Sequence, residues 1–191
     1  MSLLGQKTKS DYIPWDKMQS TVLKLERDGE LKYALLIAVG SYIGLRISDL
    51  RILKWNDILN KDFLNVIETK TKKERKITIH PDLQEIAQRI HNKMNPDVNQ
   101  YMFLNRFGKK PVSIQHINQK LKEIFKKHGV EGRISSHSLR KTLSRQIWEK
   151  NGCSDKALLL LSDLLNHSSV TVTKRYIGIQ EQEISNLYLS V

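Results

Sequence analysis

The sequence S-S-H-S-L-R-K, residues 135–141, combines the start of a helix with two functional side chains. Ser135 or Ser136 can cap a helix, because a serine hydroxyl accepts hydrogen bonds from the free amides of the first turn. His137 and Arg140 then lie on one helix face, about 4.5 Å apart along the axis. By itself the stretch is most simply a surface helix whose polar side carries both residues, so the case for a site depends on the rest of the chain.

The chain is strongly basic. Its 191 residues include 32 Lys and Arg against 20 Asp and Glu, which gives a net charge of +12 and an isoelectric point near 9.8. Such an excess attracts a polyanion, and nucleic acid is the leading candidate. Hydrophobic residues make up 39% of the chain, which is enough for a single folded domain with a substantial core.

Several classes of protein are disfavoured by what the sequence lacks. The single cysteine, Cys153, excludes an internal disulfide and a cysteine-based zinc cluster, and it fits a reducing cytoplasm. No apolar run approaches the ~20 residues of a membrane span, and the N-terminus has no signal-peptide core. We therefore predict a cytoplasmic protein that binds no membrane and needs no metal, nucleotide or other cofactor.

The hydrophobic pattern predicts a mainly α fold with a small antiparallel β-sheet, in the α+β class. Residues 1–9 are expected to be a flexible tail or residues added for expression, and residues 10–191 form one domain. Strands are predicted over 63–68 and 75–80, with a charged hairpin turn between them. Helices are predicted over residues 15–27, 31–42, 47–53, 82–94, 113–128, 136–150, 154–165, 170–176 and 180–189.

The sequence G-L-R-I-S-D-L, residues 44–50, places Arg46 and Asp49 three residues apart at the start of a helix. An arginine close to a core helix is costly unless it is paired, so Asp49 is predicted to support it through hydrogen bonds. This pair is either a purely structural ion pair or a rigid guanidinium fork for a phosphate.

The predicted hairpin turn, K-T-K-K-E-R-K over residues 70–76, carries five basic residues. A solvated turn explains any one of these lysines. As a cluster they could approach a DNA backbone, so Lys72, Lys73 and Arg75 are candidate DNA contacts.

The sequence L-L-N-H-S-S-V-T-V-T-K-R-Y ends a hydrophobic helix at His167 and leads to Tyr176 nine residues later. Tyr176 looks exposed, although a core aromatic is the commoner use of such a residue. Its neighbours Lys174 and Arg175, together with Lys141, are further candidates for DNA contact.

Together these residue types can attack a phosphodiester without a metal. A tyrosine with an ordinary pKa near 10 is only ~0.1% ionised at pH 7, and ionising it costs roughly 4 kcal/mol. Nearby cations and a base can supply that energy. Arginines neutralise the charge that develops on the phosphate oxygens, and a lysine can protonate the leaving oxygen.

The order of these residues resembles the catalytic domain of the tyrosine recombinases, the phage-integrase family. Residues 44–50 are similar to the family's first-arginine motif, residues 135–141 to its histidine and second-arginine motif, and residues 164–176 to its histidine-to-tyrosine motif. The likeness covers residues 12–191. The catalytic residues that it implies are Arg46, Lys70, His137, Arg140, His167 and Tyr176.

The resemblance implies a site-specific recombinase or integrase of a mobile element, encoded by a bacterium or a phage. Tyr176 would attack the phosphate and give a 3′-phosphotyrosyl link with a free 5′-hydroxyl. Arg46 and Arg140 would clamp the phosphate, Lys70 would protonate the leaving oxygen, and the two histidines would handle protons. A 5′-hydroxyl from a partner strand would then reverse the step without ATP.

The resemblance also implies partners. Recombinases of this family assemble as tetramers on double-stranded DNA, in some cases with accessory DNA-bending proteins. They also carry an N-terminal helical domain, which we expect to be absent here. The C-terminal helix carries the apolar residues Ile184, Leu187, Tyr188, Leu189 and Val191. It is expected either to cover its own domain, which is slightly favoured, or to dock on a neighbouring protomer.

Two departures from the family pattern are visible. Asn166 stands where the family usually has glycine. The interval from Arg140 to His167 is a few residues longer than is usual in the family. The alternatives to a recombinase are a type IB topoisomerase-like nickase-religase, which resembles this family in chemistry, and a catalytically inactive DNA-binding module of the same fold.

Overall fold

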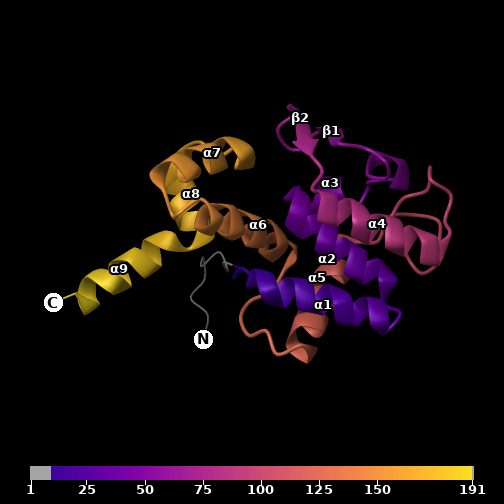
Figure 1. Ribbon diagram of the computed structural model, residues 1–191, viewed down its shortest axis with the longest axis horizontal. Helices are drawn as coiled ribbons and strands as arrows, with labels where there is room; N and C mark the ends of the chain where they lie inside the picture. Colours follow the sequence, from indigo (N-terminus) through magenta and orange to yellow (C-terminus); the bar gives the residue numbers. More distant parts are fainter. Residues whose placement is uncertain (1–9, 191) are drawn as a thin grey trace.

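A computed structural model describes residues 10–190, without the side chains of 180–184. The predicted tail, residues 1–9, lies outside the described residues. Within them the chain is helical with one two-stranded antiparallel sheet, which confirms the predicted fold class (Figure 1). The elements are α1 (Trp15–Arg27), α2 (Leu31–Ile43), α3 (Ile47–Leu50), the 3₁₀ helix η1 (Trp55–Asp57), β1 (Phe63–Ile67), β2 (Glu74–Thr78), α4 (Pro81–Met94), α5 (Ile114–Lys127), α6 (Ser136–Lys150), α7 (Asp155–Leu165), α8 (Val170–Ile177) and α9 (Ile179–Leu189).

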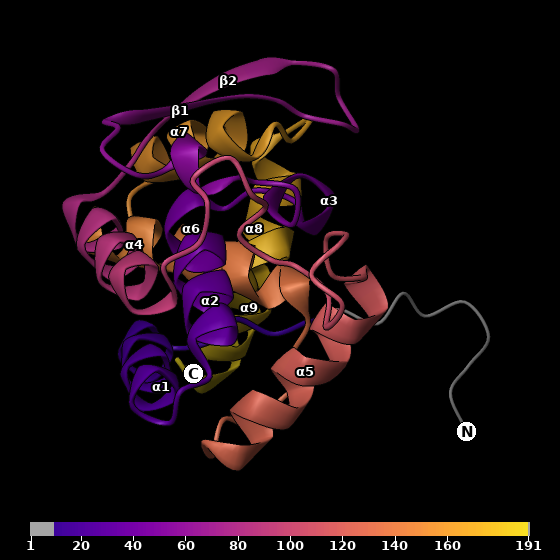
Figure 2. The ribbon, with the colours of Figure 1, turned by 90° about the vertical axis from the view of Figure 1, so that its right-hand side faces the viewer.

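Helix α2 forms the centre of the domain, and α1, α4 and α6 pack against it (Figures 1 and 2). Most of its side chains are apolar and residues 33–41 are all buried, so burial stabilises the helix where it lies. The helix ends at Gly44, which has a left-handed φ of 65°. This φ favours glycine, and a Cβ here would lie 2.6 Å from Leu143 Cδ2 on α6, so the leucine side chain would have to shift.

The hairpin of β1 and β2 lies at one end of the domain, at the top in both ribbon views (Figures 1 and 2). Its register runs from the pair Phe63 and Thr78 to the pair Ile67 and Glu74. The chain reverses between them over residues 68–73, where the Glu68 amide donates to the Lys73 carbonyl at 3.0 Å. The basic turn predicted from the sequence is therefore present.

The prediction of a helix over 47–53 is wrong in its second half, because α3 ends at Leu50. After a turn, Leu53 and Trp55 enter the core, where they are 4% and 1% exposed. The Leu53 carbonyl accepts the amide of Met102 at 2.9 Å. Burial of these side chains and pairing with a distant segment take the place of further helical turns.

Helices α6, α7 and α8 enclose a second, smaller core. It consists of Leu158, Leu161, Ile177 and Ile179, with Tyr176 packed against it. Helix α9 leaves this core and extends away from the body of the domain (Figure 1). This arrangement places the predicted nucleophile between the small core and the rest of the domain.

The exposed end of α9 differs from the favoured interpretation of the tail. Leu187, Tyr188 and Leu189 are 68%, 81% and 80% exposed. The C-terminal helix therefore does not cover its own domain over residues 185–190. The side chain of Ile184 and residue Val191 lie outside what the structure describes.

Candidate active site

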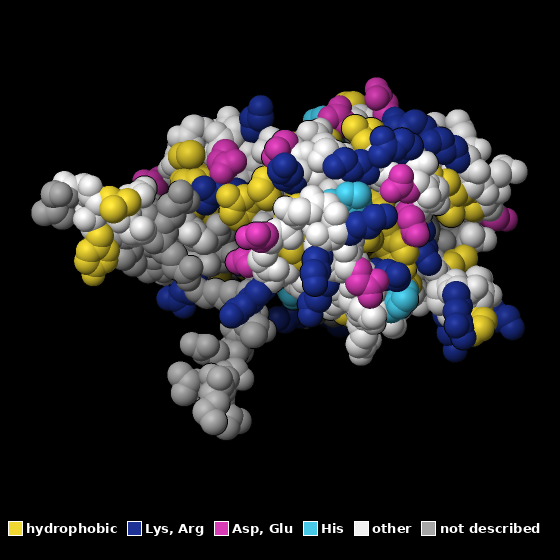
Figure 3. Space-filling model, turned by 90° about the horizontal axis from the view of Figure 1, so that it is seen from below, with side chains coloured by type: hydrophobic (Ala, Val, Ile, Leu, Met, Phe, Trp, Pro, Cys, Tyr) yellow, Lys and Arg dark blue, Asp and Glu magenta, His cyan; other side chains and the backbone are white. Residues whose placement is uncertain are grey.

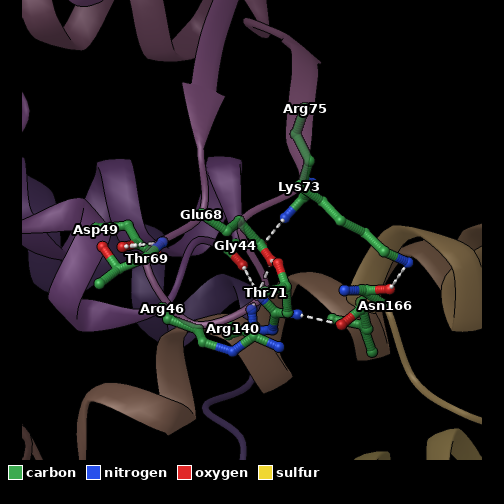
Figure 4. Close-up of polar contacts among 11 residues, drawn as sticks. Gly44, Arg46, Asp49, Glu68, Thr69, Thr71, Lys73, Arg75, Arg140 and Asn166 are labelled. Carbon is green, nitrogen blue, oxygen red and sulfur yellow. Dashed lines mark hydrogen bonds and ion pairs between the residues drawn. The ribbon is translucent and has the colours of Figure 1, made fainter.

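The side chain of Arg46 points toward the hairpin from the start of α3. Arg46 is the residue before the helix, in an extended conformation that follows directly from the turn at Gly44. Its Nη1 donates to Glu68 Oε2 at 2.6 Å, and its side chain is 20% exposed (Figure 4). The prediction that Asp49 pairs with this arginine is wrong. Asp49 is buried and accepts the amide of Thr69 at 3.1 Å, because the hairpin, not α3, supplies the carboxylate that faces Arg46.

The carboxylate of Glu68 is fully buried between α3 and the hairpin. Its Oε2 accepts from Arg46 and from Thr71 Oγ1 at 2.8 Å, and its Oε1 accepts from Arg75 Nη1 at 2.8 Å (Figure 4). Burial alone would raise the pKa of Glu68. The hydrogen bonds from Arg75, Thr71 and Arg46 outweigh it and lower the pKa to about 2, so Glu68 is ionised at neutral pH.

The ionised state of Glu68 makes stability depend on pH. Its pKa falls from an ordinary 4.5 to about 2 on folding. The stabilisation is therefore complete above pH 4.5 and is lost as the pH falls through 2. At about 1.4 kcal/mol per pKa unit, the effect is on the order of 3 kcal/mol. Urea unfolding should show that the wild-type protein loses more stability than Glu68→Gln between about pH 5 and pH 2. Identical pH dependence in the two proteins would refute this assignment.

Arg140 is held inside the domain by two backbone carbonyls. It lies on α6, is 4% exposed, and donates through Nη1 to the Gly44 carbonyl and through Nη2 to the Leu165 carbonyl, both at 2.7 Å. These carbonyls belong to the ends of α2 and α7. Burial lowers the pKa of Arg140, and the nearby Tyr176 opposes that shift. The guanidinium is thus fixed between three helices, beside the predicted nucleophile.

His137 occupies the first turn of α6, as the opening sequence predicts. Ser135 caps the helix, with its hydroxyl accepting the His137 amide at 3.2 Å. Burial lowers the pKa of His137, and the charges of Arg140, Lys141, Arg46 and Lys70 lower it further. The imidazole is therefore neutral at pH 7 and can accept a proton.

His167 follows the end of α7 and faces Tyr176. Its Nδ1 lies 3.0 Å from Thr173 Oγ1, and that hydroxyl donates its one proton to the Ser169 carbonyl at 3.4 Å. Burial, with Arg140 and Arg46, lowers the pKa of His167 to about 4. This histidine too is neutral at pH 7.

Tyr176 has its hydroxyl buried, without a hydrogen-bond partner among the described residues. Its ring meets the His167 ring edge to face at 5.1 Å between centroids. Burial raises the pKa of Tyr176 to about 12, against the opposing charges of Arg140 and Arg46. Ionising it at pH 7 then costs roughly 7 kcal/mol. In this arrangement the phenol is held neutral.

The hairpin turn brings its lysines to the same region. Lys70 is exposed, and its charge acts on His137. Lys72 is exposed and has a left-handed φ of 56°. Lys73 reaches across to α7, where its Nζ donates to Asn166 Oδ1 at 3.0 Å (Figure 4).

The other predicted DNA contacts fall into two groups. Arg175 is exposed, and Lys174 lies 3.9 Å from Asp155 on the rim of α8. Lys141 is 8% exposed; its Nζ donates to the Ser10 carbonyl at 2.6 Å and lies 5.1 Å from the centre of the Tyr176 ring. Lys141, suggested by the sequence as a DNA contact, therefore sits next to the predicted nucleophile, inside the protein.

Comparison with known proteins identifies the class. Residues 16–183 match the model of the phage integrase family. The chain is also 35% identical to "Probable integrase/recombinase YoeC" of Bacillus subtilis (strain 168), over 91% of each chain. The chain belongs to the phage integrase family.

Solved recombinases share the fold of this phage integrase family member. The crystal structure of XerA recombinase superposes with a TM-score of 0.72 at 21% identity and covers 96% of this chain and 65% of its own. XerH site-specific recombinase bound to palindromic difH substrate gives 0.68 at 16% identity, over 98% of this chain and 56% of its own. The chain thus spans about two thirds or less of these recombinases. The predicted class, tyrosine recombinase, is confirmed at the level of the family, while the role of each residue stays a prediction.

The backbone conformation at Asn166 explains why asparagine can replace the glycine that the family usually has there. Asn166 ends α7 with a left-handed φ of 51°, a conformation that glycine adopts freely and that asparagine tolerates. We predict that Asn166→Gly changes the unfolding free energy by less than about 0.5 kcal/mol, whereas Asn166→Val costs about 1–2 kcal/mol. Urea unfolding measures both. A valine variant as stable as wild type would refute the account.

Three polar residues of the site were missed from the sequence: Glu68, Thr71 and Thr173. Glu68 was noted only as the end of a strand, and neither threonine was assigned a role. The available signal was a lone acid between an apolar strand and a run of lysines, where burial requires a cationic partner. Thr173 is 0% exposed and shares a turn of helix with Tyr176.

Basic side chains also gather on the side of the molecule that faces away from the hairpin (Figures 1 and 3). Figure 3 shows Lys and Arg side chains gathered in a band over part of one face, with Asp and Glu scattered among them. This distribution agrees with the net charge of +12. Among residues 10–190, no group of His, Cys, Asp and Glu side chains is arranged to hold a metal ion, and no helix is long and apolar enough to cross a membrane.

Proposed function

We propose that this protein cuts and rejoins DNA strands at specific sites through a covalent bond between Tyr176 and a 3′-phosphate. The observation that carries the proposal is convergence: the His167 ring and Lys141 Nζ each lie 5.1 Å from the centre of the Tyr176 ring. The charges of Arg46 and Arg140 act on Tyr176 and on both histidines. A phosphate placed among these groups would meet cations, neutral imidazoles and a phenol together. Membership of the phage integrase family supports the same conclusion.

In the first step the Tyr176 oxygen attacks the phosphorus, and the bond from phosphorus to the 5′-oxygen breaks. The phenol proton passes to a neutral imidazole, for which His167 is placed best because its ring contacts the tyrosine ring. Lys70 gives a proton to the leaving 5′-oxygen. Arg46 and Arg140 stabilise the charge on the non-bridging oxygens.

The second step is the reverse of the first. A 5′-hydroxyl from a partner strand attacks the phosphotyrosyl phosphorus, loses its proton, and releases Tyr176, which regains one. The number of phosphodiester bonds is unchanged, so no ATP is required. Rejoining to a different strand distinguishes recombination from the relaxation that a type IB topoisomerase performs.

The test uses nicked DNA duplexes whose sequence around the nick is randomised. Cleavage beside a nick releases a short fragment and traps the covalent complex, which can be isolated under denaturing conditions and sequenced. The proposal predicts recovery of a shared sequence by wild-type protein. Strand exchange between two duplexes carrying that sequence should follow; relaxation of supercoils without exchange would favour the topoisomerase alternative, and recovery of no covalent complex would overturn the proposal.

The exposed end of α9 suggests how protomers assemble on DNA. The apolar side chains Leu187, Tyr188 and Leu189 lie outside their own domain, while Ile179 at the base of the helix is 1% exposed in the small core. Removing residues 180–191 therefore spares that core. We predict that this deletion leaves cleavage of one site within about threefold and abolishes the pairing of two sites.

Gel mobility of one-site and two-site DNA measures both quantities for the α9 deletion. The double substitution Leu187→Asp and Leu189→Asp is the matched control, since it keeps the helix and removes only its apolar surface. Pairing of two sites that survives both changes would show that α9 makes no contact between protomers.

A further inference from the structure

The buried carboxylate of Glu68 connects two parts of the proposed site that the sequence places far apart. It is 0% exposed and accepts hydrogen bonds from Arg46 at the start of α3 and from Thr71 in the hairpin turn. Arg75 from β2 binds its second oxygen. One carboxylate thus touches the first predicted arginine and the loop that carries the predicted general acid, Lys70 (Figure 4).

We infer that Glu68 is a positioning residue for DNA cleavage, which fixes where Arg46 meets the phosphate and where the turn presents Lys70. The inference rests on the proposed function. Glu68 itself touches neither the phosphate nor the reacting atoms in this assignment. It acts through two arms, one to the arginine and one to the turn.

The arm to Arg46 leaves the arginine available for a phosphate. A guanidinium carries five N–H donors in one plane, and the structure gives Arg46 one hydrogen bond, from Nη1 to Glu68. Among the described residues the other nitrogens have no partner, and the side chain remains 20% exposed. The ion pair therefore orients the guanidinium without using up its donors.

The turn is held on both sides of Lys70, by Asp49 on one side and by the arm from Glu68 on the other. The Thr69 amide donates to Asp49 Oδ1 at 3.1 Å, and the Thr71 hydroxyl donates to Glu68 Oε2 at 2.8 Å. Lys70 itself is exposed between these two anchors. Its backbone is thus held while its side chain is left to reach the leaving oxygen.

A merely structural ion pair would make the same contacts, so the test must separate the two roles. The probes are three duplexes that carry the sequence recovered with nicked DNA. One has an ordinary scissile phosphate. One has a methylphosphonate, which has no negative charge for an arginine to neutralise. One has a sulfur at the 5′-bridging position, whose leaving thiolate needs no proton.

For Glu68→Gln we expect single-turnover cleavage of the ordinary phosphate to fall about 10- to 100-fold, with the DNA dissociation constant within about threefold. Part of this defect comes from a misplaced Arg46, and a methylphosphonate has no negative charge for Arg46 to neutralise. The defect of Glu68→Gln should therefore be smaller on the methylphosphonate than on the ordinary phosphate. For Thr71→Val, which removes only the second arm, the defect should shrink on the sulfur substrate and persist on the methylphosphonate. Glu74→Gln, at an exposed acid of the same hairpin, is the matched control and should cleave all three normally.

Thermal unfolding of each variant at the assay pH shows whether it is folded. Three results would overturn the inference: normal or faster cleavage by folded Glu68→Gln, equal loss on all three substrates, or a defect of Thr71→Val that the sulfur substrate does not relieve. If Glu68→Gln does not fold, cleavage by Thr71→Val tests the contact of Glu68 with the turn. Cleavage of the phosphate and the methylphosphonate by Arg46→Lys then tests its contact with the arginine. Wild-type protein that forms no adduct on the ordinary phosphate would instead refute the proposed function.

Discussion

Tyr176→Phe should abolish the covalent adduct, lowering its rate of formation by more than about 10³-fold, while DNA binding stays within about threefold. The substitution removes only the phenol oxygen, and the phosphate contacts proposed for Arg46, Arg140 and the hairpin remain. Because that hydroxyl is buried without a partner, its removal should not destabilise the fold and can add up to about 1 kcal/mol. Denaturing gels, a binding titration and urea unfolding measure the three quantities.

Tyr188→Phe is the control for this result. Tyr188 is 81% exposed on α9 and should not affect adduct formation on a single site. A Tyr176→Phe protein that still forms an adduct, with Tyr188→Phe inactive, would move the nucleophile to α9 and contradict the site described above.

Lys70→Ala should slow cleavage of an ordinary phosphate by about 10²- to 10⁴-fold, the usual contribution of a general acid. A 5′-bridging sulfur substrate should restore the rate, since a thiolate leaves without a proton. The measurement is single-turnover cleavage of both substrates by the same protein preparations.

Lys72→Ala and Lys73→Ala are the matched controls for the general acid. Lys72 follows Thr71 in the turn, and Lys73 is engaged with Asn166. Each should weaken DNA binding more than the cleavage step and should gain no selective benefit from sulfur. Rescue of Lys72→Ala or Lys73→Ala in place of Lys70→Ala would transfer the role to that lysine.

The sequence was informative where a local rule is sufficient. The serine cap of α6, the apolar helix α2 and the basic turn were all predicted, because caps, hydrophobic patterns and charge runs depend on neighbouring residues. The end of α3 was not. It depends on Leu53 and Trp55 entering a core that distant segments complete.

The partners within the site were harder to predict than its members. Asp49 lies three residues from Arg46 and was the obvious carboxylate, yet Glu68 binds the arginine from 22 residues away in the chain. Which acid faces which cation is decided by how the hairpin docks on α3. In the same way, Tyr176 looked exposed, but the packing of α8 on α7 buries its hydroxyl.

The chemistry of the trapped adduct tests the central claim most directly. After capture on nicked DNA, protease digestion and mass spectrometry identify the modified residue, and labelling of the released strand by a polynucleotide kinase detects a free 5′-hydroxyl. The account predicts a nucleotide joined through its 3′-phosphate to the peptide that contains Tyr176, together with a released strand that accepts the label. Attachment to any other residue, or a 5′-phosphate on the protein, would contradict it.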